Sequence, residues 1–169
     1  MRIRRVLVVG AGIAGSTLAY WLARHGIETT VVERSTGQCS SGSPVDVRGP
    51  ALAVVEQMNL LAPLREASTL ATNLAVVNGR GRRIGWIPTQ TSADGLEIPR
   101  SDLAAILAGA VSGNAEFLYD DTVAALDDDG HGVDVTFERA AGRRFDLVVG
   151  ADGLHSRVRR LMFGPESLQ

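Results

Sequence analysis

Three glycines near the start of the chain have the spacing of a phosphate-binding turn. A run of Val and Leu ends at Gly10, and Gly10, Gly12 and Gly15 stand in GxGxxG spacing before a helix-like stretch. In a strand–turn–helix unit the first glycine permits a tight turn, the second lets a pyrophosphate approach the backbone, and the third lets helix and strand pack closely. The phosphates would then meet free N–H groups at the positive end of the helix dipole.

A single carboxylate stands where a ribose contact is expected. Thr29–Val32 is β-branched and predicts a second strand, and Glu33 follows it, close to the roughly 20 residues past the glycines at which an acid binds a ribose hydroxyl. An acid there disfavours a 2′-phosphate, so FAD or NAD is favoured over NADP. Two alternatives are an incidental Gly-rich turn and a secretory signal. The glycines that interrupt the apolar run argue against the signal.

Composition excludes several other classes of protein. A net charge of -2 gives no argument for a nucleic acid or a membrane partner, and no apolar run approaches the ~20 residues that span a bilayer. The single Cys39 excludes an intrachain disulfide and a Cys-rich metal site, and the absence of Lys excludes Schiff-base chemistry. We expect one domain over residues 1–169, without a metal site, in the reducing cytoplasm.

Apolar periodicity predicts an α/β fold that would position these residues. Residues 35–49 are rich in Gly, Ser and Pro and predict a long loop. Strands 122–126 and 133–137 alternate apolar and polar residues, which predicts antiparallel pairing, whereas the run 145–149, apolar except for Asp146, predicts one strand buried on both faces. The other predicted strands are 29–33, 74–77, 84–87 and 116–119, and the predicted helices are 16–24, 51–58, 63–67, 102–111 and 156–163.

Four sequence pieces together resemble a known family. They are GAGIAG at 10–15, Glu33-Arg34, EIPRSDL at 97–103 and GADGLHSRVR at 150–159. Their order resembles the N-terminal FAD-binding part of flavoprotein monooxygenases of the p-hydroxybenzoate hydroxylase type, which include polyketide-tailoring aromatic hydroxylases and tetracycline-inactivating enzymes. The resemblance implies a Rossmann-like FAD-binding domain, with a mainly parallel sheet and a β-meander. Full members continue into a substrate-binding domain, so this chain is expected to be incomplete relative to the family.

The resemblance implies a set of cofactor-binding residues. Gly10, Gly12, Ile13, Ala14 and Gly15 would meet the FAD pyrophosphate, with Glu33 on the adenosine ribose and Arg34 beside the adenine.

Three further residues match positions that approach the cofactor in the family. Arg48 and Arg100 would lie near the flavin's phosphate and ribityl region, and Asp152 would contact FAD and shape where NAD(P)H docks. Each has an alternative. Arg48 in its loop could simply be solvated, Arg100 precedes a helix whose dipole disfavours a cation, and Asp152 could shape its own turn.

The activity implied by the resemblance is NAD(P)H-dependent hydroxylation of an aromatic or polyketide-like small molecule through a flavin C4a-hydroperoxide. This chemistry belongs to the cofactor, so no side chain is assigned as acid, base or nucleophile. One alternative is a truncated, non-catalytic nucleotide-binding remnant. Another is half of a split enzyme whose second chain carries the substrate domain. A third, an NAD-dependent dehydrogenase, would lack the GADG and SxVR pieces.

Overall fold

The computed structural model describes residues 2–37, 42–69, 73–88 and 95–164. The chain divides into two compact units, Met1–Ser40 with Leu107–Gln169 and Ser41–Ile106. We call them the first and the second unit. The assignment of residues 1–169 to one domain stays a prediction.

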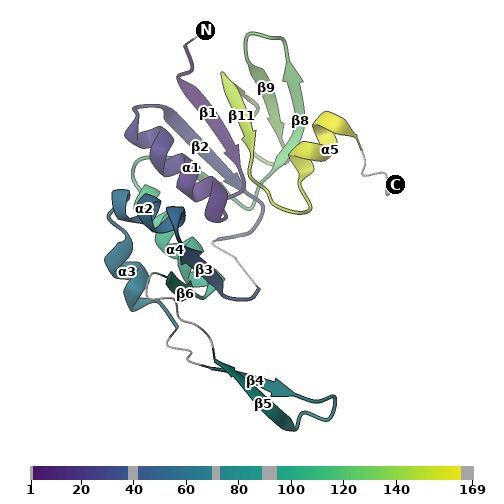
Figure 1. The fold of residues 1–169 in the computed structure, drawn as a ribbon. Coiled ribbons are helices and arrows are strands. Elements are labelled where there is room, and N and C mark those ends of the chain that lie inside the picture. Colours follow the sequence, from purple (N-terminus) through teal and green to yellow (C-terminus); the bar gives the residue numbers. More distant parts are fainter. Residues whose placement is uncertain (1, 38–41, 70–72, 89–94, 165–169) are drawn as a thin grey trace. The chain divides into compact units, whose positions relative to one another are not determined.

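The first unit is built on a four-stranded parallel sheet with the order β11-β1-β2-β7 (Figure 1). Its strands are β1 (Arg5–Val9), β2 (Glu28–Glu33), β7 (Glu116–Tyr119) and β11 (Leu147–Gly150). Each neighbouring pair is parallel, with Val8 opposite both Val31 and Val149. This sheet confirms the predicted α/β fold class. In the central strand β1, a continuous Val and Leu run follows Arg5, as expected for a strand that is covered on both faces.

The two faces of the sheet are covered by different layers. On one face α1 (Ile13–Arg24) packs its Ala19 against Val6, Val8 and Val31. The other face packs Leu7 and its neighbours against an antiparallel three-stranded sheet with the order β10-β9-β8. These strands are β8 (Val123–Asp128), β9 (Val133–Phe137) and β10 (Arg143–Phe145), and they form the predicted meander. The helix α5 (Arg157–Phe163) completes the unit.

The prediction of one buried strand over 145–149 is wrong in two respects. Asp146 separates β10 from β11, because its carboxylate accepts hydrogen bonds from the backbone N–H groups of Arg4 (2.7 Å) and Arg5 (2.8 Å). In addition, β11 is an edge strand, so Leu147 is 39% exposed. The apolar run therefore belongs to two sheets.

The second unit holds two short antiparallel strand pairs and helices. One pair joins β3 (Val45–Arg48) to β6 (Gly95–Ile98), and the other is the predicted hairpin of β4 (Asn73–Val77) and β5 (Arg83–Pro88). The helices are α2 (Pro50–Gln57), α3 (Leu61–Glu66) and the start of α4 (Arg100–Val111), whose residues from Leu107 belong to the first unit.

The predicted loop 35–49 contains a strand. Within it, Val45 and Val47 alternate with polar residues as β3, which pairs with β6. Cys39 lies outside the described residues. No helix in the described ranges is both long and apolar enough to cross a membrane.

Candidate functional site

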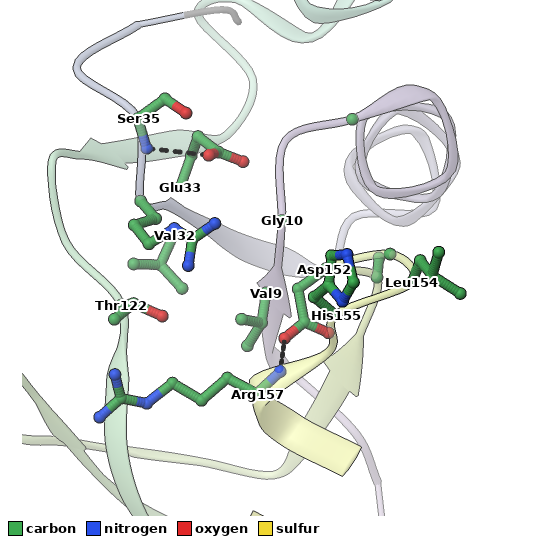
Figure 2. A pocket seen from close by; sticks show the side chains of 14 residues that line it. Val9, Gly10, Val32, Glu33, Ser35, Thr122, Asp152, Leu154, His155 and Arg157 are labelled. Carbon is green, nitrogen blue, oxygen red and sulfur yellow. Dashed lines mark hydrogen bonds between the residues drawn. The ribbon is translucent and has the colours of Figure 1, made fainter. Parts of the chain in front are cut away.

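The carboxyl ends of the four parallel strands meet at one edge of the first unit and enclose a pocket of about 330 Å³. Figure 2 shows this pocket. Its lining comes from the end of β1 and the turn after it, the end of β2 and the residues after it, the residue before β8, the turn after β11 and the start of α5. The lining residues are Val9, Gly10, Gly12, Val32, Glu33, Arg34, Ser35, Thr122, Ala151, Asp152, Gly153, Leu154, His155 and Arg157.

The strand order explains why the pocket forms here. From β1 the chain adds β2 and then β7 on one side, and it returns to place β11 on the other side of β1. Connections that leave neighbouring strands in opposite directions open a crevice at the carboxyl ends of those strands. The pocket occupies this crevice between the turns that follow β1 and β11.

The three glycines of the turn after β1 have three different structural roles. Gly10 has φ +104°, and a Cβ there would lie 2.6 Å from the carbonyl oxygen of Ala151. A Cβ on Gly15 would lie 1.8 Å from the carbonyl oxygen of Gly10. A Cβ on Gly12 would meet no atom within 4 Å, although Gly12 lines the pocket. Gly10 and Gly15 are therefore needed by the fold, whereas Gly12 leaves space for something outside it.

The first turn of α1 can accept an anion beside that space. Gly12 is the N-cap residue, no side chain caps the helix, and its first turn carries no acidic residue. The first intrahelical bond in this region runs from the Ser16 N–H to the Gly12 carbonyl at 2.9 Å. The N–H groups of Ile13, Ala14 and Gly15 have no acceptor in the preceding turn of the helix, and they lie at its positive end. This donor set and the open space at Gly12 fit a pyrophosphate group.

Glu33 reaches the glycine turn directly. One carboxylate oxygen accepts a hydrogen bond from the Ala11 N–H, and the other accepts one from the Ser35 N–H, both at 2.9 Å. Each oxygen keeps a further lone pair, so the carboxylate can still accept a hydroxyl hydrogen. The side chain is thus fixed before any ligand arrives. The neighbouring Arg34 is exposed and lines the same pocket.

Asp152 lines the pocket, but its carboxylate is directed at α5. It accepts hydrogen bonds from the Ser156 hydroxyl (2.6 Å) and from the backbone N–H groups of Arg157 (2.6 Å) and Val158 (3.2 Å). The Ser156 hydroxyl in turn accepts from the Arg159 N–H at 3.0 Å. Asp152 therefore holds the turn after β11 against the helix start. The predicted contact of Asp152 with a cofactor stays a prediction.

Arg48 and Arg100 belong to the second unit and do not line this pocket. Both are exposed. They lie toward opposite ends of the β3–β6 pair, because Arg48 is opposite Gly95, whereas Arg100 follows Ile98 at the other end. The backbone thus places the two arginines toward opposite ends of this strand pair, and their predicted role stays a prediction.

Sequence reasoning missed four polar residues of the pocket: Ser35, Thr122, His155 and Arg157. The Arg157 side chain forms an ion pair with Glu138, which ties α5 to the end of β9. Arg157 belongs to the recognised SxVR piece, so that motif could have marked it. Thr122 carries no local signal, because only the pairing of β7 with β2 brings it to this edge.

Two titratable groups beside the pocket have shifted pKa values. Burial raises the pKa of Asp121, but hydrogen bonds from the N–H groups of Ala140, Thr122 and Arg139 outweigh burial and lower it overall. Burial, followed by the nearby Glu33 charge, raises the pKa of the Tyr119 hydroxyl. Neither shift creates an acid or base inside the pocket. Within the described ranges, no group of three or more His, Cys, Asp or Glu residues could hold a metal ion.

Comparisons with known proteins agree with this geometry. A family model described as FAD binding domain matches residues 4–163. The Mycobacterium tuberculosis protein Rv1260 is 48% identical over 170 residues, which cover 97% of this chain and 46% of that protein. A flavin-dependent monooxygenase from an unknown prokaryotic organism is 32% identical over 167 residues, covering 96% of this chain and 43% of the relative.

Solved structures are similar over the same range. The tetracycline destructase Tet(51) has a TM-score of 0.85 at 33% identity and covers 96% of this chain and 42% of its own. The structure of CtdE in complex with FAD has a TM-score of 0.81 at 21% identity and shares the fold, over 97% of this chain and 42% of its own. The chain spans less than half the length of these curated relatives and solved structures.

Proposed function

We propose, from the premise that this chain belongs to the FAD binding domain family, that its pocket binds FAD within an NAD(P)H-dependent flavin monooxygenase. Membership confirms the family predicted from the sequence motifs and accounts for the α/β fold with its parallel sheet.

One observation carries the proposal for the pocket. Gly12 lines it with open space where a Cβ would stand, beside uncapped N–H groups of α1. We assign the pyrophosphate to this position, with contacts from Gly10, Gly12, Ile13, Ala14 and Gly15.

The rest of the pocket suits the sugar end of the ADP half. The Glu33 carboxylate, held by two backbone N–H groups, would accept hydrogen bonds from the ribose hydroxyls, and Arg34 would lie beside the adenine. A pocket of about 330 Å³ is at the low end of the roughly 300–1,000 Å³ range of ligand pockets, which suits one half of a dinucleotide. In the same proposal, Asp152 contacts the cofactor from the turn after β11, and Arg48 and Arg100 approach its flavin half.

The proposed reaction is hydroxylation of an aromatic or polyketide-like small molecule. FAD would supply the redox and oxygen-transfer chemistry at its flavin C4a position. The contribution of this chain is to hold and orient the ADP half, and no side chain of the pocket is assigned as catalytic acid, base or nucleophile. Similarity to a tetracycline destructase and to flavin-dependent monooxygenases supports this substrate class. The proposed compartment is the cytoplasm, where NAD(P)H is available.

We further propose that the substrate-binding part is supplied by polypeptide beyond the region matched here, on the same or on a second chain. The hairpin β4–β5 supports this, because Leu74 and its cross-strand partner Ile87 are 56% and 54% exposed, and Trp86 is 57% exposed. Clusters of exposed large apolar residues mark surfaces that another segment covers. A two-stranded hairpin is also marginally stable without such cover.

Binding and activity are tested separately. Purified chain is titrated with FAD and with NADP, and binding is followed by flavin fluorescence and calorimetry. We expect FAD to bind in preference to NADP, since Glu33 disfavours a 2′-phosphate. Tight NADP binding without FAD binding would contradict the proposal. Incubation with FAD, NADPH and a panel of phenolic and polyketide substrates, followed by mass spectrometry, then tests oxygen transfer. Because this chain supplies little to exclude water from a flavin, we expect uncoupled NADPH oxidation at most.

A further inference from the structure

Polar groups lie across the pocket in the same order as the phosphates, ribose and base of a nucleotide. The glycine turn follows β1, Glu33 ends β2, and Thr122 comes shortly after β7. These three strands are consecutive neighbours in the sheet, about 4.8 Å apart. If the phosphates lie at the glycines and the ribose at Glu33, the base lies toward Thr122. Val9 and Val32 are apolar lining residues of the same pocket, and Val32 stands next to Glu33 in the chain.

The Thr122 side chain is free to contact a ligand. Thr122 is only 6% exposed and lines the pocket. Its backbone is engaged, because its N–H donates to Asp121 at 2.8 Å and its carbonyl accepts from the Glu138 N–H at 2.9 Å. Its hydroxyl has no hydrogen-bond partner among the described residues, and none of their fully buried side-chain polar atoms is unsatisfied. The hydroxyl therefore opens into the pocket, as Figure 2 shows.

A network around Asp121 fixes the position of Thr122. Besides the Thr122 N–H, the Asp121 carboxylate accepts hydrogen bonds from the N–H groups of Arg139 (3.0 Å) and Ala140 (2.8 Å). The Asp121 N–H donates to the carbonyl of Glu33 at 3.2 Å. Asp121 thus joins the β9–β10 turn, through its carboxylate, to the end of β2, through its backbone N–H. The wall that carries Thr122 is set relative to Glu33 before a ligand binds, which reduces the cost of ordering it on binding.

We propose that the Thr122 hydroxyl hydrogen-bonds the adenine base of the bound nucleotide and contributes to the affinity of this chain for adenine nucleotides. The proposal rests on the proposed binding of FAD in this pocket. A threonine hydroxyl can both donate and accept, so it can pair with either kind of group on the edge of the base. Asp121 acts as the positioning residue behind it.

The test compares Thr122→Val, which keeps the shape and removes the hydroxyl, with Thr122→Ser, which keeps the hydroxyl. Thr136→Val makes the same chemical change at an exposed position of β9 outside the pocket and serves as the control. Because the Thr122 hydroxyl has no partner within the described chain, the valine leaves no protein group unpaired, and circular dichroism and urea unfolding should match wild type. Affinities for FAD, ADP and ribose 5-phosphate are measured by calorimetry or by competition.

We expect Thr122→Val to lower the affinity for FAD and for ADP about threefold to tenfold, which is the range for the loss of one hydrogen bond. Thr122→Ser should retain most of the affinity, and Thr136→Val all of it. The affinity for ribose 5-phosphate, which has no base, should not change. Unchanged ADP affinity in Thr122→Val overturns the inference, and so does an equal loss for ribose 5-phosphate, which would place Thr122 on the sugar. If wild type binds neither FAD nor ADP, the proposed function itself fails.

Discussion

Substitution of Gly12 by Val separates binding from folding more sharply than any other change in the turn after β1. The backbone of Gly12 has φ −72° and ψ −168°, an extended conformation open to any residue, and its Cβ would meet nothing within 4 Å. Two small effects on stability oppose each other. Loss of glycine flexibility in the unfolded chain stabilises by about 0.4–1 kcal/mol, and loss of a favourable N-cap residue costs about as much. The free energy of unfolding should therefore change by less than about 1 kcal/mol.

Binding should respond very differently to the same substitution. The valine methyl groups would occupy the space assigned to the pyrophosphate and keep it from the N–H groups of α1. A hydrogen bond to a charged group contributes about 1.5–3 kcal/mol, so losing one weakens FAD binding by about 10- to 150-fold, and losing two weakens it by about 100-fold or more.

The matched variant is Gly15→Ala, in which a smaller side chain meets the Gly10 carbonyl oxygen at 1.8 Å. Strand and helix must then separate, and we expect a loss of about 3 kcal/mol or more in urea unfolding. FAD affinity is measured by flavin fluorescence for every variant that folds. The assignment of the phosphate position would be refuted if Gly12→Val bound FAD with wild-type affinity. It would also be refuted if Gly12→Val lost as much stability as Gly15→Ala.

Three other substitutions test the surroundings of the pocket. Glu33→Gln replaces one of two accepting oxygens by an amide that faces a backbone N–H, so unfolding in urea should show a loss of about 1–3 kcal/mol, and wild-type stability would be the contrary result. Asp121→Asn should cost a similar amount by the same assay. The pKa of Asp121 is lower in the folded chain than its ordinary value of 3.8, so its carboxylate stabilises the fold above pH 3.8 and loses this effect as the pH falls through the folded pKa. The stability advantage of wild type over Asp121→Asn should therefore be constant above pH ~5 and shrink below pH ~4. An advantage independent of pH would count against this explanation. Finally, Trp86→Ser in the exposed hairpin should reduce self-association of the isolated chain in light scattering, whereas the same substitution at the half-buried Trp21 of α1 should not.

The parts of the site that are local in sequence could be predicted from it. The turn at Gly10 and the close packing at Gly15 follow from a motif that joins one strand to the next helix, and the structure shows both, with open space at Gly12. The end of β2 at Glu33 follows equally from a β-branched run. Short segments of this kind carry their own pattern, so no distant contact is needed to interpret them.

The parts that depend on distant pairing could not be predicted. The strand β3 exists because Val45 pairs with Ile98, and its four residues were hidden within a Gly- and Ser-rich stretch. Thr122 enters the pocket only because Tyr119 pairs with Glu33 across the sheet. Asp152 shows a different limit, because a GADG motif places the residue at the pocket while the structure turns its carboxylate to α5.

The position of β11 beside β1 determines when the parallel sheet and its pocket are completed during synthesis of the chain. Asp146 and Arg4 are hydrogen-bonded across 142 positions of sequence, so β1 lacks one of its neighbours until synthesis has passed β11. Loops of this length close slowly, since their conformational entropy must be lost before the strand pairing stabilises the fold. The nascent chain thus exposes one edge of β1 while the glycine turn is already made. The turn after β11 completes the crevice last, so we expect newly made chains to gain affinity for nucleotide only after Gly150 has left the ribosome.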